Sequence, residues 1–462
     1  MHSGSRATDV PMPERTLAPS PAIVRGASEA SAAAAAELDR AWPVSRRLLW
    51  VALLVCSCYA YGGGLVRELT APGKKIADFF QEWASARNYY TGRPIYTPQR
   101  ETAQAYLNYT ARPQDFFVEI NGHPPTAVVL ALPFGLLDYN AGFLLWNWLS
   151  VAAVVGSAVL IMRETGIRFS AWALLPALAL LIGNPLLQHL ACGQLGGFLL
   201  LLMTSAWLCD RRGYSGWAGA ILAVATAVKL FPGFLFLYFV WKGKWRTVFV
   251  GAATFFAVVG LTAAILGTQS FVDFVQHAMP EVGKYRRTWA NASLDGFWTR
   301  LLSAESDRAI PLVAGRWLPK IAYLLSAATL VGTLAYFTRR CRTRESNDLA
   351  FGLHIAAMLL VSPITWDHYF LLLTQPLLLV AYHLSRRDLI RKLLTPALFM
   401  LWLNPLFLWM LFLGADLITV FTIVSSTEKN IFIVSLPFYA LVTTFAITAI
   451  VTKRTIEETR PV

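Results

Sequence analysis

The stretch TVFVGAATFFAVVGLTAAILG, residues 247–267, decides the fold class, because it carries no charged side chain over the length of a membrane crossing. A run of about 20 apolar residues in a helix spans the hydrocarbon core of a bilayer, which is about 30 Å thick. Lipid offers no hydrogen-bond partners, so such a run satisfies its own backbone by forming a helix. Comparable runs recur along the 462-residue chain, and the alternating segments of a β-barrel are not visible.

The composition agrees with a chain that lies mostly in lipid. Hydrophobic residues make up 56% of the sequence and charged residues 15%, whereas soluble domains carry about 25% charged residues. We predict an all-α polytopic integral membrane protein with about 12 transmembrane helices, within a range of about 11 to 13. The expected spans are residues 48–66, 124–138, 140–162, 171–188, 194–209, 215–240, 247–267, 317–337, 348–363, 367–384, 393–413 and 431–451.

The net charge of +13 does not indicate a nucleic-acid partner, because the basic residues cluster in short loops between apolar runs. That placement is typical of cytoplasmic topology anchors. The five cysteines lie in or beside apolar runs and resemble small buried hydrophobic residues. The basic clusters are Arg46-Arg47, Arg211-Arg212, Lys242/Lys244/Arg246, Arg339-Arg340/Arg342/Arg344, Arg386-Arg387/Arg391-Lys392 and Lys453-Arg454.

One conflict arises when the expected spans alternate strictly across the bilayer. Alternation puts Arg163–Arg168 and Arg211-Arg212 outside, against the preference of basic loops for the cytoplasm. A re-entrant or half-spanning segment within 124–240 would resolve this conflict, although the sequence does not place it. Pro232 indicates a break inside the run 215–240.

The expected organisation is one membrane domain between two tails. Residues 1–46, rich in Ala, Ser and Pro, are predicted to be a disordered cytoplasmic tail, and 452–462 a second cytoplasmic tail. Residues 47–451 form the transmembrane domain. Its two long polar segments, 67–122 and 268–316, are expected as the first and second extracytoplasmic loops, the first of them helical.

Asp78 and Glu82 stand out in the first loop. If residues 76–90 form a helix, the two carboxylates lie one turn apart on the same face. A carboxylate near the membrane surface can act as a general base toward a sugar hydroxyl. An interfacial helix whose acids only face water explains the same spacing. Both interpretations remain open from spacing alone.

Two single residues are unusual for their surroundings. Lys229 lies in an apolar run without other charges, and an intramembrane lysine indicates a functional site unless it snorkels to the surface. Facing a lipid phosphate, it would supply a point charge for an anionic headgroup. His123 precedes Pro124-Pro125 at the entry to the next apolar run, where an interfacial side chain and a ligand contact fit equally well.

Polar clusters also follow the later apolar runs. Arg286 and Arg287 in the second loop can bind phosphate or anionic lipid, or lie in solvent. Asn291 opens a sequon, which is weak evidence by itself. Asp367 and His368 form an acid–imidazole pair that should share a membrane face with Asp78; a helix N-cap is the alternative.

Several nucleotide and metal motifs are missing from the sequence. It contains no Walker loop, no GxGxxG between a strand and a helix, and no HExxH. We therefore expect no nucleotide cofactor, and any glycosyl donor should be carried by a lipid.

The polar clusters, in their order along the chain, resemble glycosyltransferase family 87, whose members are polytopic enzymes of the GT-C class that use polyprenyl-phosphate sugars. Each motif is short, and their joint order over residues 47–450 carries the resemblance. The matching pieces are Asp78-Phe79, Ala84, Ala86-Arg87, Tyr90, Gly92, Pro94-Ile95-Tyr96, His123-Pro124-Pro125, Gly193-Gln194, Lys229-Leu230-Phe231-Pro232, Asn291-Ala292-Ser293-Leu294, Ser362-Pro363 and Trp366-Asp367-His368.

The resemblance implies a GT-C-type fold and an inverting transfer of a hexosyl group, mannosyl above all, to a glycolipid or lipid-linked glycan of the bacterial cell envelope. It implies a multi-pass protein of the bacterial plasma (inner) membrane, with an active site that faces the periplasm or cell exterior and needs no metal. Asp78 would be the catalytic base. Donor or acceptor binding would fall to Glu82, His123, Lys229, Arg286, Arg287, Asn291, Asp367 and His368.

A polytopic transporter or lipid flippase is the main alternative. Transporters concentrate polar residues near the middle of the membrane, often in repeated halves. Here the polar clusters lie mostly at one face and in loops of unequal length, which favours an enzyme. Lys229 is the residue that fits the alternative.

Overall fold

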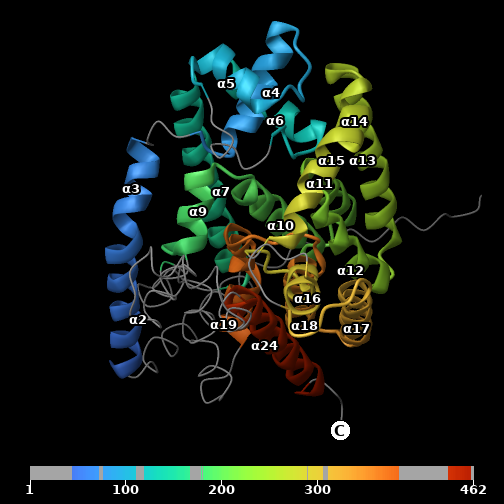
Figure 1. The fold of residues 1–462 in the computed structure, drawn as a ribbon. Helices are drawn as coiled ribbons and strands as arrows, with labels where there is room; N and C mark the ends of the chain where they lie inside the picture. Colours follow the sequence, from blue (N-terminus) through green and yellow to red (C-terminus); the bar gives the residue numbers. More distant parts are fainter. Residues whose placement is uncertain are drawn as a thin grey trace, which may run out of the picture.

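The computed structural model describes residues 44–71, 76–110, 119–166, 178, 181–288, 290–304, 311–383 and 435–458. All regular structure in these ranges is helical, which confirms the all-α class (Figure 1). Five described helices are long and apolar enough to cross a membrane, or up to six if a bent pair counts as one span. The count of about 12 stays a prediction, because most of the tail 1–46, much of the run 171–188 and the whole run 393–413 lie outside the described residues.

The long helices divide into inner and outer ones. They are α2–η1–α3 (Val44–Ser57, Cys58–Gly62, Gly63–Thr70), α7 (Tyr139–Glu164), α13 (Trp245–Leu266), α17 (Leu318–Arg340) and α24 (Leu436–Glu458). In α7 and α24 44% of the most apolar window is buried, against 11% in α13 and 17% in α17. Side chains left uncovered along an apolar helix are suited to lipid, so α13 and α17 form the outside of the bundle.

Both polar loops contain short helices. The first loop holds α4 (Phe79–Thr91) and α5 (Gln99–Leu107), which lie at one end of the protein, opposite the end of α24 (Figure 1). Its predicted helical character is confirmed. The second loop holds α14 (Gln269–Asp273), η4 (Phe274–Ala278), α15 (Met279–Gly283), η5 (Lys284–Arg287) and α16 (Leu294–Leu302).

Helices α7 and α10 (Gly196–Arg211) run in the same direction. At the start of α7, the Tyr139 hydroxyl accepts a hydrogen bond of 3.0 Å from the Ala77 amide, next to Asp78. At their other ends the Glu164 carboxylate pairs with Arg211 at 3.3 Å and with Arg212 at 2.7 Å. The basic residues that strict alternation put outside therefore lie at the end of the molecule away from Asp78.

Other basic loops gather at that same end, which we call the basic end. Lys244 pairs with Asp210 at 2.5 Å. The Lys242 ammonium donates a 2.6 Å hydrogen bond to the carbonyl of Cys341, between α17 and α18 (Arg344–Val361). Asp348 in α18 forms a salt bridge with Arg211 and accepts a 2.9 Å hydrogen bond from the indole N–H of Trp207. The basic end is thus one connected surface opposite the first loop.

Helix α6 (Pro125–Gly135) is the half-spanning segment that the sequence could not place. Its 11 residues extend about 16 Å, roughly half of a bilayer core. The chain before it is bonded to α4, and α7 after it starts beside Ala77, so both ends of the segment lie at the Asp78 end. The Thr126 hydroxyl reaches the Ala227 carbonyl at the end of α11. The expectation of a full span at 124–138 is therefore wrong.

A second segment that does not cross the whole molecule is the hairpin formed by residues 215–241, which starts at the basic end. Helix α11 (Ser215–Val228) leaves the basic end, and η3 (Phe231–Leu235) with α12 (Phe236–Trp241) return to it, so that Lys229 lies at the turning point. The predicted break at Pro232 is confirmed. The hairpin is held against α13 where a Cβ on Gly219 would lie 2.1 Å from the Thr247 carbonyl oxygen. Only glycine permits this helix contact.

Candidate active site

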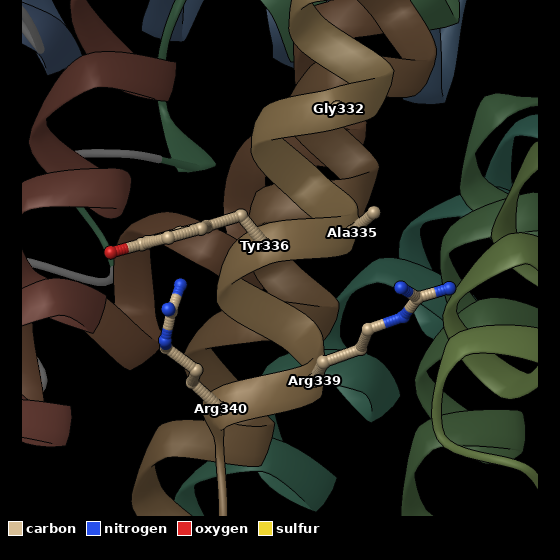
Figure 2. Close-up of a pocket in the computed structure, with 5 residues that line it drawn as sticks. All are labelled: Gly332, Ala335, Tyr336, Arg339 and Arg340. Atoms are coloured by element: carbon tan, nitrogen blue, oxygen red, sulfur yellow. The ribbon is translucent and has the colours of Figure 1, made fainter.

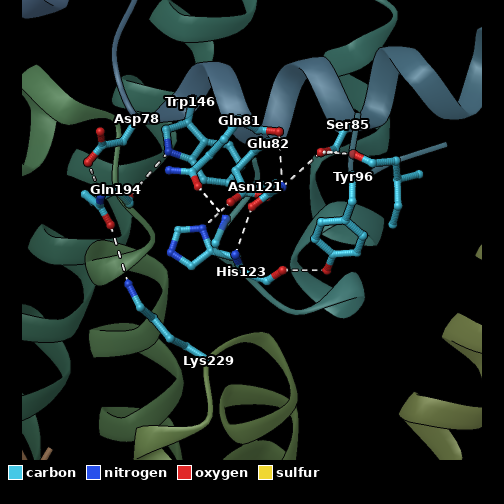
Figure 3. A network of polar contacts seen from close by, with 12 residues as sticks. Asp78, Gln81, Glu82, Ser85, Tyr96, Asn121, His123, Trp146, Gln194 and Lys229 are labelled. Carbon is cyan, nitrogen blue, oxygen red and sulfur yellow. Dashed lines mark hydrogen bonds and ion pairs between the residues drawn. The ribbon is translucent and has the colours of Figure 1, made fainter. Parts of the chain in front are cut away.

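Asp78 lies directly before α4, and its carboxylate is held from the membrane side. The Gln194 side-chain amide donates a 2.6 Å hydrogen bond to Asp78 Oδ2 (Figure 3). Gln194 lies at the bend between α9 (Asn184–Cys192) and α10, which meet at 117°. The broken helix thus presents a side-chain amide to the first loop.

The bend that presents Gln194 depends on Gly193. Gly193 has a φ of +66°, which side chains with a Cβ rarely adopt. A Cβ there would lie 2.5 Å from the Phe143 ring and 2.6 Å from Cβ of Phe79. Phe79 and Phe143 stack with ring centroids 5.6 Å apart, so the aromatic packing under α4 and the position of Gln194 are fixed together.

Lys229 approaches the same amide from the opposite side. Its ammonium lies 3.5 Å from Gln194 Oε1 (Figure 3). It also lies 4.4 Å from the ring centroid of Tyr369. Lys229 is 9% exposed, and no carboxylate in the described ranges pairs with it. A buried cation that is held by an amide oxygen and an aromatic face is suited to receiving an anion. Lys229 therefore lies buried beside Gln194 and Tyr369, and its role in binding stays a prediction.

Glu82 and His123 form a pair one helical turn beyond Asp78. The Glu82 carboxylate binds Nδ1 of His123 and accepts a 3.4 Å bond from the Asn121 amide. Gly122 donates its backbone N–H, at 2.9 Å, to the Gln81 side chain. These contacts fix the imidazole against α4 (Figure 3). Asp78 and Glu82 therefore both bind other side chains of the protein, and their part in a ligand site stays a prediction.

The late cluster comes to the same place through η6 (Asp367–Leu373), which packs against α9. Asp367 Oδ2 accepts a 3.0 Å hydrogen bond from the Asn184 side-chain amide. Asp367 Oδ1 accepts a 2.8 Å hydrogen bond from the backbone N–H of His368. His368 is buried, and its Nε2 has no hydrogen-bond partner within the described part of the chain. His368 lies within electrostatic range of Lys229 and His123, so the late cluster is close to these two residues; the membrane face that it shares with Asp78 stays a prediction.

Asn291, which we expected to contact a ligand, forms four hydrogen bonds with backbone groups of the protein. Its Nδ2 donates to the carbonyls of Arg286 and Pro363 at 3.0 and 2.9 Å, and its Oδ1 accepts from Ser293 and Thr365 at 3.0 and 2.9 Å. All its hydrogen-bonding atoms are thus used by backbone groups. Asn291 joins the second loop to the turn before η6, and its predicted ligand contact stays a prediction.

The arginine pair of the second loop lies farther out. Arg286 Nε donates to Asp295 Oδ2 at 2.7 Å, and both arginines are exposed. The neighbouring Tyr285 ring lies 6.4 Å from that of Trp366, directly before Asp367. Arg286 and Arg287 therefore stand at the rim of the site, where long side chains can reach an entering anion.

Burial raises the pKa of Asp78 above its usual value, because the carboxylate has lost much of its water. The hydrogen bond from Gln194 and the charges of His123 and Lys229 act in the opposite direction, and Glu82 raises the pKa further. A carboxylate with a raised pKa is a stronger base while it stays ionised at neutral pH.

Gln194, Asn184 and Tyr369 are the site residues that sequence reasoning missed. Gly193-Gln194 and Asn184 were visible as a polar interruption between apolar runs. Nothing in the sequence indicated that the chain bends there by 117° and brings Gln194 to Asp78. Tyr369 resembles any interfacial aromatic residue until its ring is seen beside Lys229.

A Gln194→Leu variant is expected to move the acidic limb of the kcat/KM profile to higher pH. The amide stabilises the ionised form of Asp78, so its removal raises the Asp78 pKa, and the base is protonated at a higher pH. The pH–rate profile of purified protein measures this shift. Gln81→Leu, which removes an amide with no contact to Asp78, is the matched control. An acidic limb at the wild-type position in Gln194→Leu contradicts the assignment.

Comparison with known proteins finds a family model and several relatives that are similar to this chain. The sequence model of glycosyltransferase family 87 matches residues 122–363, which include His123 and Lys229. A polyprenol-phosphate-mannose-dependent alpha-(1-2)-phosphatidylinositol pentamannoside mannosyltransferase of Mycolicibacterium smegmatis is 25% identical over 268 residues, covering 56% of this chain and 60% of the relative. The protein of the same name from Mycobacterium tuberculosis is 28% identical over 259 residues, covering 54% and 55%.

A third relative matches over a longer range. A polyprenol-phosphate-mannose-dependent alpha-(1-2)-phosphatidylinositol mannoside mannosyltransferase of Mycobacterium tuberculosis is 26% identical over 364 residues, covering 73% of this chain and 77% of the relative. The chain spans less than two thirds of the first two relatives. Because the family match covers slightly more than half of its length, the chain belongs to glycosyltransferase family 87.

Proposed function

We propose that this protein transfers a mannosyl group from a polyprenyl-phosphate mannose to a glycolipid or lipid-linked glycan acceptor, with inversion at the anomeric carbon. The observation that carries the proposal is the chain of contacts from the Asp78 carboxylate through the Gln194 amide to the Lys229 ammonium. It places a base and a cation at the two ends of one rigid amide. A displacement reaction needs both, on opposite sides of the reacting carbon.

Asp78 acts as the general base. The acceptor hydroxyl gives its proton to the Asp78 carboxylate while its oxygen attacks the anomeric carbon of the donor. The bond between that carbon and the phosphate oxygen breaks, and the phosphate leaves with the electron pair. Attack opposite to the leaving group turns a β-linked mannosyl donor into an α-linked product.

Lys229 stabilises the departing phosphate. Its ammonium has no carboxylate partner in the described ranges, so its charge is available to the negative charge that develops on the leaving oxygen. The buried Nε2 of His368 provides a further hydrogen-bonding atom in the same region. Asp367 fixes the turn that carries His368 through its bond to Asn184.

The Glu82–His123 pair serves the acceptor side. Glu82 orients the imidazole through Nδ1, which leaves Nε2 for a sugar hydroxyl. Arg286 and Arg287 at the rim attract the anionic lipids that carry both substrates. With Asp78 at the end opposite the basic loops, the site faces the periplasm or cell exterior of a bacterial plasma membrane.

Transfer in a reconstituted system tests the proposal. Purified protein in liposomes is mixed with a synthetic polyprenyl-phosphate β-mannose and mannosylated phosphatidylinositol acceptors, and the product linkage is determined by NMR. We expect an α-mannosyl product and free polyprenyl phosphate in equal amounts. A β-linked product would contradict the inverting displacement.

A lipid flippase is the second candidate, supported by a lysine at the turning point of a half-spanning hairpin. The same liposomes distinguish the two, since a flippase moves a fluorescent polyprenyl-phosphate sugar between leaflets without forming a glycoside. Movement without transfer to any acceptor would replace the proposed activity with transport.

A further inference from the structure

One face of α17 carries a pocket at the basic end. Gly332, Ala335, Tyr336, Arg339 and Arg340 line a cavity of about 510 Å³. These positions follow the spacing of one helix face, with two small residues toward the middle of the helix and two arginines at its end. Arg340 lies on the Tyr336 side of the helix and Arg339 on the other, so the guanidinium groups flank this face (Figure 2).

The two arginines are available for an anionic ligand. Both are exposed, and neither forms a salt bridge with a carboxylate in the described ranges. The Arg340 guanidinium lies 3.6 Å from the ring centroid of Tyr336, which orients it without neutralising its charge. By contrast, Arg211, Arg212 and Lys244 at the same end are each paired with a carboxylate.

The surroundings indicate a ligand that has an apolar part as well. Helix α17 is a candidate membrane span that ends at Arg340, and most of it is open to lipid. A Cβ on Gly332 would meet no heavy atom within 4 Å, so the pocket is open beside this glycine. Arginines at the end of a span lie at headgroup depth. The part of the pocket at Gly332 and Ala335, farther along the span, then lies at the depth of acyl chains.

We propose that this face of α17 binds one anionic phospholipid, with its phosphodiester between Arg339 and Arg340 and an acyl chain along Ala335 and Gly332. The bidentate guanidinium geometry suits phosphate, and the tyrosine ring covers the glycerol region. The pocket lies at the basic end, whereas the proposed active site lies at the Asp78 end. Helix α10 connects the two ends and so keeps the two sites apart. Lipid binding at the pocket does not depend on the proposed reaction.

Lipid titration tests the site on the full-length protein in detergent. Native mass spectrometry measures binding of phosphatidylglycerol and of phosphatidylcholine, with glycerol phosphate and inorganic phosphate as headgroup probes. We expect wild-type protein to prefer phosphatidylglycerol, and each of Arg339→Gln and Arg340→Gln to weaken that binding about fivefold. Lys320→Gln, at the other end of the same helix, is the matched control and should leave it unchanged.

A shape variant separates a lipid site from simple charge attraction. Gly332→Leu keeps both arginines and has room to fold, since nothing surrounds the missing Cβ. The leucine side chain should fill the open part of the pocket beside position 332 and weaken phosphatidylglycerol binding. Binding of free phosphate should stay the same. Equal binding of the two phospholipids by wild-type protein, or undiminished phosphatidylglycerol binding in Gly332→Leu, overturns the proposal.

Discussion

Asp78→Asn is expected to lower kcat by about 10³-fold, because the amide cannot take the proton of the acceptor hydroxyl. Asparagine keeps the size of the side chain, so binding of donor and acceptor should change little. The measurement is the steady-state rate of transfer from polyprenyl-phosphate mannose, with KM determined for both substrates. A large loss in kcat with nearly constant KM is the signature of a group that acts in the transition state.

The control for this variant is Asp138→Asn. Asp138 is the aspartate before α7, where its carboxylate caps the helix by accepting 3.1 Å bonds from the backbone of Asn140 and Ala141. Asparagine caps helices equally well, so this variant should keep wild-type transfer. If Asp78→Asn also transfers mannose at the wild-type rate, Asp78 is not the base, and the carboxylate of Glu82 becomes the group to examine.

Lys229→Met is expected to lower kcat by about 10²-fold or more, since loss of one preorganised charge at a leaving group costs about this factor. Methionine fills the buried space without a charge, which separates the electrostatic role from packing. The deficit should shrink for a donor whose phosphate is a weaker base, because that leaving group needs less stabilisation. Rates with the two donors give this comparison directly.

Lys242→Met provides the matched control at the basic end, where the ammonium binds only the Cys341 carbonyl in the described ranges. It should leave transfer unchanged. A lysine that merely reached the membrane surface would be as dispensable as Lys242. Equal rates for Lys229→Met and wild-type protein would therefore remove Lys229 from the proposed mechanism.

Hydropathy was sufficient to predict the helical class and the long spans that the structure describes, because lipid leaves an apolar run no other structure. The break at Pro232 was predictable from the proline itself. It was insufficient for α6, whose composition matches a span but whose ends are both tied to the Asp78 end. Direction across the membrane is set by such tertiary contacts. In the sequence, only the conflict between strict alternation and the basic residues around Arg163 and Arg211 indicated a segment that does not cross the membrane.

The site was predictable where a residue is out of place in its surroundings, as with Lys229 in an apolar run or Asp367-His368 between two of them. Gln194 was not predictable as a contact of Asp78, since the two are 116 residues apart and meet only because Gly193 turns the chain. The role of Asn291 was also hidden. Two of its four bonds to backbone groups depend on a turn further along the chain, at Pro363 (72 residues on) and Thr365 (74 residues on).

The order in which the site residues leave the ribosome has a consequence for biogenesis. Asp78, Gln194 and Lys229 are inserted well before Asp367 and His368, which reach the same place only through η6 packing against α9. A nascent chain that stops before η6 therefore holds a base and a cation but an unfinished wall. We therefore expect a chain that ends before η6 to lack transfer activity, because Asp367 and His368 are absent from it.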